Sequence, residues 1–295
     1  MRRLLHICLA LLALLALGVA VPAAAEAGER EVPRMTTFGG SCPKCELSGR
    51  RLRGAHFMGA DFSGASFVGS DLREARFIAS KFNDANLTRA DLTSSQIIGA
   101  WFKGATLTNA HLRDTQASGS VFTEANLTGA DFADSAAQGT NFNEATLTNA
   151  TFRDADLTGA QLNHVIGRGA NFADAILRAA NLTNGRFEKA SFKDAVLDAA
   201  VLQGGTFDGA NFEDASLRHA QLGGADLSRA RGLTQEQLDE ACGDSRTRLP
   251  SGLSVRNGCA GMHINIRIPR VIVTTPAPPT PPAPPRYLVE PEPGP

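Results

Sequence analysis

Residues 55–72 read AHFMGADFSGASFVGSDL, and this stretch shows the pattern that governs most of the chain. Every fifth residue is phenylalanine or leucine, and a small residue, usually alanine, stands two positions before it. The register runs from Leu47 to Leu227, and its exceptions do not shift it: Ile97, Ala117, Ala137 and Gly167. A period of five fits neither the 3.6-residue turn of a helix nor the two-residue alternation of a strand, so it indicates a repeat architecture.

A second period, of 20 residues, lies inside the first. Phenylalanine recurs at this spacing from Phe62 to Phe142, and leucine continues the same series from Leu162 to Leu222. Since like residues recur after four repeats, each coil is expected to have four sides of five residues and to stack on the next coil. With a strand spacing of roughly 4.7–4.9 Å, about nine coils would form a rod on the order of 45 Å long.

The five-residue units resemble the pentapeptide-repeat family, whose consensus is a small residue, Asp or Asn, Leu or Phe, a polar residue and often Gly. Close matches are Ala60-Asp61-Phe62-Ser63-Gly64, Ala130-Asp131-Phe132 and Ala155-Asp156-Leu157-Thr158-Gly159. The resemblance implies an all-β fold, namely a right-handed quadrilateral parallel β-helix with the large apolar and small residues pointing inward. It implies no single activity, because the family is functionally diverse.

Composition divides the chain into segments around this repeat. We expect the following: a signal peptide (1–25), a flexible leader (26–41), the pentapeptide-repeat β-helix (42–231), a C-terminal helical and disulfide cap (232–260), a short strand (261–275) and a proline-rich disordered tail (276–295). Ile264, Ile266 and Ile268 alternate with polar residues in the short strand, which either extends a face of the sheet or stays unpaired. The tail is expected to be extended and polyproline-like.

The N-terminus has the pattern of a cleavable secretory signal. Basic residues at Arg2 and Arg3 precede an apolar run, and three alanines end at Ala25, so cleavage is expected between Ala25 and Glu26. The apolar run is short for a membrane span of about 20 residues, which favours cleavage over an uncleaved anchor. We therefore expect an exported protein, periplasmic or extracellular, without a stable membrane anchor.

Both ends of a β-helix expose unpaired backbone groups and need covers. At the N-terminal end, the segment Cys42–Leu52 is expected to provide one. At the C-terminal end, Thr234 and Gln237 form a capping-box pattern that predicts a short helix, with Gly243 as a candidate terminator. Apolar residues of this helix can pack on the last coil: Leu233, Leu238 and Ala241.

Four cysteines of the mature chain fall into two pairs near opposite ends of the predicted rod. A disulfide needs Cα atoms within about 7 Å, so the expected bonds are Cys42–Cys45 and Cys242–Cys259. The CxxC spacing of the first pair is also found in redox and zinc sites. A thioredoxin-like context and further zinc ligands are missing nearby, which favours a structural disulfide in an oxidising compartment and leaves a redox role open.

No motif for catalysis, phosphate binding or dinucleotide binding is present, so we expect no catalytic residues, no cofactor and no metal. The four histidines of the repeat fall at different positions around the coil and do not stack: His56, His111, His164 and His219. The chain has 29 Lys and Arg against 30 Asp and Glu, a net charge of −1 that gives no reason to expect nucleic-acid binding.

One group of outward-facing residues is unusually apolar. Met58, Ile78 and Ile98 share one column, and Trp101, with Val121 above it, faces outward on the next side. We call these five residues the apolar strip. Contiguous apolar surface often marks a contact site, so Trp101 is a candidate anchor for a partner protein or a second copy of the chain. The alternative is that the leader or the tail covers the strip.

The sequence therefore predicts a non-enzymatic, exported scaffold for protein–protein interaction. The alternative function is a DNA mimic that inhibits or protects a type II topoisomerase, an activity that the family resemblance brings into consideration. Such mimics are strongly acidic and cytoplasmic, whereas this chain is nearly neutral and carries an export signal. A homodimer through the predicted helix near Thr234–Cys242 is a further option.

Overall fold

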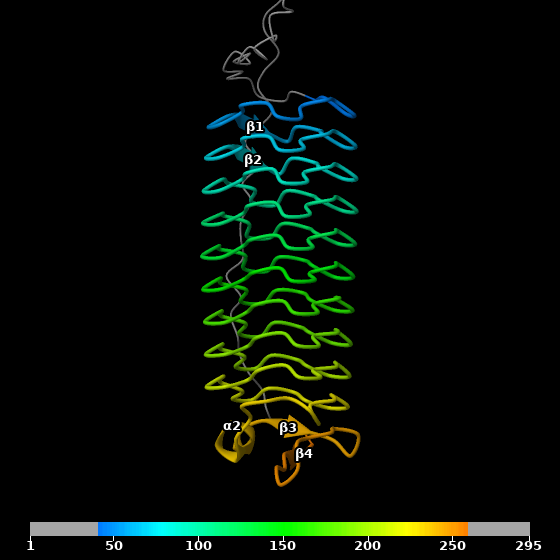
Figure 1. Cartoon of the computed structure of the whole chain (residues 1–295), viewed down its shortest axis with the longest axis vertical. Helices are drawn as coiled ribbons and strands as arrows, with labels where there is room; N and C mark the ends of the chain where they lie inside the picture. The colour runs from blue at the N-terminus through cyan, green and yellow to red at the C-terminus, as the bar shows by residue number, and fades with distance from the viewer. Residues whose placement is uncertain (1–40, 259–295) are drawn as a thin grey trace, which may run out of the picture.

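A computed structural model describes residues 41–258, which form a straight stack of coils (Figure 1). The predicted signal peptide, nearly all of the leader, Cys259, the strand 261–275 and the tail 276–295 lie outside the described residues. The fold is a right-handed parallel β-helix. Between residues 41 and 258, no helix has the length and apolar character that crossing a membrane requires.

Successive coils are joined by parallel bridges between residues 20 positions apart. One coil is bridged to the next at four places: Asp61↔Lys81, Ser66↔Asn86, Asp71↔Asp91 and Arg76↔Gln96. The longest pairing in this part joins strand β1 (His56–Met58) to strand β2 (Arg76–Ile78), with Phe57 opposite Phe77. The 20-residue period of the sequence is thus the length of one coil.

The five-residue unit follows from the backbone hydrogen bonds. The N–H of Asp91 donates to the carbonyl oxygen of Ser70 in the preceding coil, at 2.9 Å. The N–H of Leu92 donates to the carbonyl oxygen of His111 in the following coil, at 2.7 Å. The chain then turns through Ser94, whose φ is +58°. Because an L-residue adopts this left-handed conformation at a cost, the turn position is often Gly, Asn or Asp. The next N–H, of Ser95, closes the turn on the Leu92 carbonyl at 3.0 Å.

Large side chains stack in columns inside the rod. The rings of Phe82 and Phe102 lie 4.8 Å apart, those of Phe102 and Phe122 4.7 Å apart, and both pairs are nearly parallel. A second column runs from Phe132 to Phe212 on the opposite side, with neighbouring centroids 5.0–5.1 Å apart. Rings from the two columns meet edge to face, so the aromatic core is continuous across the coils.

The interruption at Gly167 has a local structural cause. A Cβ at this position would lie 2.6 Å from Cδ1 of Phe187, whose ring already fills the space. Val165 occupies the inward position that alanine takes in most other repeats, and it is fully buried. The volume missing at residue 167 is therefore supplied by its neighbours.

Helix α2 (Gln235–Asp239) closes the C-terminal end of the stack (Figure 1). Thr234 is its N-cap, and the reciprocal bonds with Gln237 complete a capping box. Nε2 of Gln237 also donates to the carbonyl oxygens of Phe212 and Ala215, at 2.8 and 2.9 Å. These two backbone acceptors of the last coil therefore have a hydrogen-bond donor. Leu238 is fully buried against that coil.

Beyond α2, the chain adds part of a further coil. Strand β3 (Cys242–Gly243) pairs in parallel with β4 (Arg256–Asn257), and Cys242 is bridged to Gln221. The prediction that Gly243 ends the helix is wrong, because the helix ends at Asp239 with Glu240 as its C-cap. Gly243 is needed for packing instead, since a Cβ there would lie 2.7 Å from Thr247 Oγ1 and Val255 Cγ1.

Asp244 holds this terminal turn. Hydrogen bonds from the side chain and backbone of Arg246, together with one from the Gly224 N–H, lower the pKa of Asp244 to about 2. The carboxylate therefore stays ionised in the folded chain well below the pH at which a free aspartate protonates.

Candidate functional site

The coil geometry brings the apolar strip together on the surface near the N-terminal end of the rod. Met58 lies opposite Ile78 in the β1–β2 pairing, and Trp101 is bridged to Val121. Trp101 is 51% exposed, whereas Met58, Ile78, Ile98 and Val121 are half-buried. The sequence prediction that Trp101 faces outward, with Val121 above it, agrees with this geometry.

A row of small residues at one corner connects the two halves of the strip. All four have a φ in the left-handed region: Gly59, Ala79, Gly99 and Gly119. A Cβ at Gly59 or Gly119 would meet no atom within 4 Å, so the space beside this corner is open. Small residues therefore keep this corner free of bulky side chains next to Ile98 and Trp101.

Basic side chains surround the strip. Arg76 and Lys81 are exposed, and Lys81 is bridged to Trp101 in the next coil. Lys103, two residues after Trp101, is also exposed and lies 3.3 Å from Glu124. We call Arg76, Lys81 and Lys103 the cationic rim. The rim was not predicted from the sequence, although the 20-residue register places Lys81 and Trp101 in one column.

The charge near the strip is not purely positive. Hydrogen bonds from the Ser63 hydroxyl and backbone N–H, and the nearby charge of Lys81, lower the pKa of Asp61 below its ordinary value. Asp61 is half-buried and turned into its own loop, where its Oδ1 accepts from the Ser63 N–H at 2.9 Å. Arg76 and Lys81 are therefore exposed cations close to the strip in sequence, whereas Lys103 is paired with the exposed Glu124.

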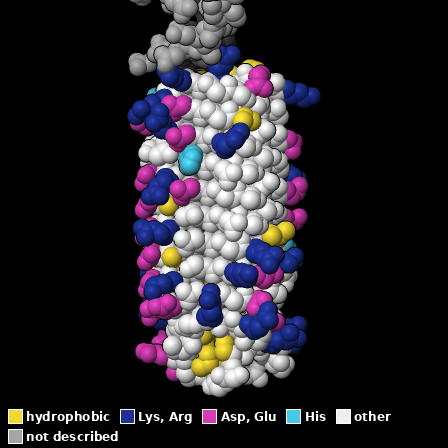
Figure 2. Space-filling model, in the orientation of Figure 1, with side chains coloured by type: hydrophobic (Ala, Val, Ile, Leu, Met, Phe, Trp, Pro, Cys, Tyr) yellow, Lys and Arg dark blue, Asp and Glu magenta, His cyan; other side chains and the backbone are white. Residues whose placement is uncertain are grey.

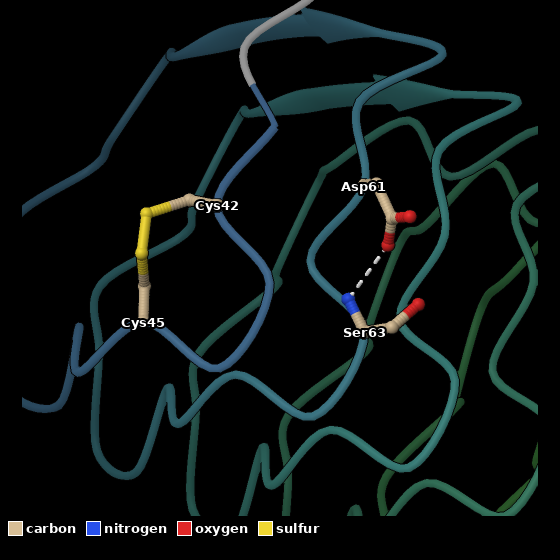
Figure 3. The surroundings of a disulfide bond; sticks show 4 residues. All are labelled: Cys42, Cys45, Asp61 and Ser63. Carbon is tan, nitrogen blue, oxygen red and sulfur yellow. Dashed lines mark hydrogen bonds between the residues drawn. A yellow bond between two sulfur atoms is a disulfide. The ribbon is translucent and has the colours of Figure 1, made fainter.

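Asp61 and Ser63 lie next to the disulfide of the first coil (Figure 3). Cys42 and Cys45 are bonded, with their Cα atoms 5.4 Å apart, and both pack partly buried against the core. The N–H of Cys42 donates to the Asp61 carbonyl oxygen at 2.7 Å, and the N–H of Cys45 donates to the Cys42 carbonyl oxygen at 3.2 Å, so the disulfide spans a single four-residue backbone turn within the coil. The segment Cys42–Leu52 lies in the first described coil and is hydrogen-bonded to the coil that follows, and its role as the N-terminal cover stays a prediction.

Other candidate chemistry is sparse in the described part. Cys242 is disulfide-bonded, but its predicted partner Cys259 lies outside the described residues, so that pairing stays a prediction. Between residues 41 and 258, no three His, Cys, Asp or Glu side chains converge on a position that could hold a metal ion. The histidines of the repeat lie in separate places, as their sequence positions predict.

A shallow groove of about 660 Å³ runs between the last coil and α2. Acidic residues line it, including Glu213, Asp214, Glu236 and Glu240. Glu213 is paired with Lys193 at 2.8 Å, and this pairing lowers the pKa of Glu213. The remaining lining comes equally from the last coil and from the cap segment, so the groove lies where the cap packs on the coil.

One corner of the rod carries aspartate at the left-handed turn position in successive coils: Asp114, Asp134, Asp154, Asp174, Asp194 and Asp214. Basic residues in the adjacent column offset this charge, as in the pairs Arg113–Asp134 and Arg153–Asp154, each at 2.7 Å. In the view of Figure 2, charged side chains of both signs gather along the margins of the rod, and the band between them is largely uncharged. The visible surface is therefore mixed in charge.

Comparison with known proteins agrees with the repeat geometry. Models described as pentapeptide repeats match residues 44–77, 155–194 and 195–231, and a model described as a pentapeptide repeat region matches residues 86–162. No curated protein sequence matches the chain.

Several solved structures are similar to the chain, all with low TM-scores. HetL from the cyanobacterium Nostoc sp. PCC 7120, a pentapeptide repeat protein involved in regulation of heterocyst differentiation, is 23% identical, with a TM-score of 0.40 over 67% of this chain and 91% of HetL. Full-length QnrB1, a plasmid-mediated fluoroquinolone resistance protein, is 18% identical, with a TM-score of 0.23 over 71% of this chain and 93% of QnrB1. A pentapeptide repeat protein from the Arabidopsis thaliana thylakoid lumen is 28% identical, with a TM-score of 0.19 over 44% of this chain and 70% of its own.

Proposed function

The chain belongs to the pentapeptide-repeat family, and we propose that it is a non-enzymatic, exported scaffold that binds a protein partner through the apolar strip. The observation that carries the proposal is the exposure of Trp101, at 51%, on a backbone fixed by hydrogen bonds to the coils on both sides. Tryptophan is favoured as an anchor at interfaces because it buries a large area with little loss of conformational entropy. A rigid rod presents this anchor without having to order itself first.

The proposal includes a rod of four-sided coils, about nine in number at the strand spacing of roughly 4.7–4.9 Å. Four bridges in every 20 residues support the four-sided shape. It also includes no enzymatic activity, no cofactor and no nucleic-acid ligand. The fully buried side chains that fill the rod support this part, because a filled lumen offers no internal pocket for a substrate.

Export is part of the same proposal. The N-terminal pattern ending at Ala25 and the disulfide-bonded state of Cys42, Cys45 and Cys242 support an oxidising compartment, since disulfides are rare in reducing ones. Fractionation of the host, with N-terminal sequencing, tests it. We expect a mature start at Glu26 in the periplasm or the medium, and an intact Met1 in the cytoplasm would contradict export.

The alternative, a DNA mimic acting on a type II topoisomerase, finds one favourable observation in the aspartate corner from Asp114 to Asp214. The neighbouring cations weaken it, because Arg113 and Arg153 neutralise members of the corner. A mimic of the phosphate backbone needs a continuous negative surface. We therefore favour the scaffold.

The strip is tested by replacing Trp101 and Ile78 together with serine. We expect the protein to stay folded, because both side chains face outward, and to lose retention of its partner or its self-association in pull-down and sedimentation experiments. Ile166→Ser is the matched control, since Ile166 is a large apolar residue, 41% exposed, in a column outside the strip. Equal behaviour of the double variant and the control would contradict the proposed contact site.

A further inference from the structure

The apolar strip and the cationic rim together have a chemistry that one segment of this chain matches. We propose that residues 287–295, in the C-terminal segment outside the described part, dock in cis on the strip and cover Trp101. This inference rests on the proposed function, because it takes the strip to be a docking surface. It adds a resident occupant that a partner must displace.

The segment reads Tyr287-Leu288-Val289-Glu290-Pro291-Glu292-Pro293-Gly294-Pro295. Its first three residues are large and apolar or aromatic, and they match the apolar surface of Ile78, Ile98 and Trp101. Its two charged residues are both glutamates, and they match the cationic rim. Opposite charges around an apolar centre fix the register and orientation of a bound peptide. The prolines lower the conformational entropy that the segment loses on binding, and proline-rich chains dock on exposed aromatic rings.

The segment is long enough to reach the strip from the other end of the rod. Bridges connect Trp101 through Val121, Asn141, Gln161, Asn181, Val201 and Gln221 to Cys242. These seven steps at the strand spacing amount to roughly 34 Å. The described chain ends at Gly258, in the cap, and the 29 positions from there to Tyr287 would extend about 90 Å at the polyproline rise of 3.1 Å per residue. A tether of this length keeps the segment at a high effective concentration near the strip.

The leader is the weaker candidate for the same place. Residues 26–41 mix Glu29 and Glu31 with Arg30 and Arg34, whereas the segment after Arg286 carries no basic residue. The cationic rim therefore favours the C-terminal segment. Removal of the leader serves as a control, and it should leave Trp101 covered.

The composition of the chain supplies a direct test, because Trp101 is the only tryptophan and Tyr287 is the only tyrosine. Excitation of tyrosine should contribute to the emission of Trp101 in the purified full chain, since docking brings the two rings together. We expect this contribution to be lost in a Glu290→Lys/Glu292→Lys variant, with a red shift of Trp101 emission and stronger quenching by acrylamide. The Glu290→Gln/Glu292→Gln variant should lose less of the tyrosine contribution than the charge-reversal variant does.

A reciprocal change tests the charge pairing. Arg76→Glu/Lys81→Glu should also abolish the tyrosine contribution, and combining it with Glu290→Lys/Glu292→Lys should restore it. Both rim residues face solvent, so circular dichroism should show an intact rod in each case. A full chain with no tyrosine contribution, or reversals that leave the contribution unchanged, would overturn the proposal.

Further outcomes separate the other occupants from this one. A tyrosine contribution that grows with protein concentration, together with a larger sedimentation coefficient, would show docking in trans and overturn the intramolecular form. Exposure of Trp101 after removal of residues 26–41, but not after the glutamate reversals, would assign the strip to the leader. If Trp101 is exposed in the full chain while Trp101→Ser/Ile78→Ser still loses its partner, the proposed function stands and this inference fails.

Discussion

Two sides of the same coils are filled in opposite ways between residues 95 and 142. On one side, Phe102, Phe122 and Phe142 stack ring on ring, with centroids 4.7 and 5.3 Å apart. On the adjacent side, the same inward position is held by Ile97, Ala117 and Ala137, which are just as fully buried. Identical backbone geometry thus accepts a phenylalanine or an alanine.

The difference shows that core volume is distributed over a coil rather than fixed at each position. Buried hydroxyls flank the alanine side: Ser95, Thr115, Ser120, Ser135 and Thr140. Three of them donate to carbonyls, as Ser120 does to Ile97 and Thr140 to Ala117, at 2.5 and 3.0 Å. The third is Thr115, which donates to Leu112 at 2.7 Å. Buried hydroxyls therefore bond to the coil backbone beside the alanine side, whereas the phenylalanine side is filled by stacked rings.

The largest expected effect comes from breaking the aromatic side. Phe122→Ala should lower the free energy of unfolding by about 3–5 kcal/mol, because the ring is fully buried between two stacked neighbours and leaves a cavity. Urea unfolding followed by circular dichroism measures the change. Phe122→Leu should lower the free energy of unfolding clearly less, since leucine already occupies this column at Leu162. Equal losses for the two variants would show that ring stacking, rather than filled volume, stabilises this side.

The next effect tests whether leucine, a consensus residue of the repeat, can be placed at the exception Gly167. Gly167→Leu should destabilise by about 1–3 kcal/mol, because the added side chain overlaps the ring of Phe187. Adding Phe187→Leu, which makes room, should recover part of the loss in the same urea experiment. A stabilised Gly167→Leu protein would contradict the view that neighbours already supply the missing volume.

The sequence predicts the fold well because the determinants of the coil are local. Each five-residue unit contains its inward residues and its turn, so the register found at Phe62 holds as far as Leu227. The filling of core volume is not local, because one unit can supply the volume that another lacks. The filling of the space at Gly167 by Val165 and Phe187 was therefore not predicted. The apolar strip was found from the columns, as Ile78 and Ile98 share one. The cationic rim was missed because Arg76, Lys81 and Lys103 lie in different columns.

The smallest effect compares two buried serines beside the alanine side. Ser120 donates its hydroxyl to the Ile97 carbonyl, so Ser120→Ala should lower the free energy of unfolding by about 1 kcal/mol. The hydroxyl of Ser135 has no hydrogen-bond partner among the described residues, and an unpaired buried polar group is itself unfavourable. Ser135→Ala should therefore be neutral or slightly stabilising.

The two variants remove the same atom from similarly buried positions, so each is the control for the other. Their difference in unfolding free energy, measured by urea titration under one condition, isolates the hydrogen bond from the loss of packing. Equal losses would mean that the Ser135 hydroxyl is paired in solution, with a buried water as its partner beside Ala137. The alanine side would then be stabilised by hydrogen bonds along its whole length, and its contrast with the phenylalanine side would become sharper.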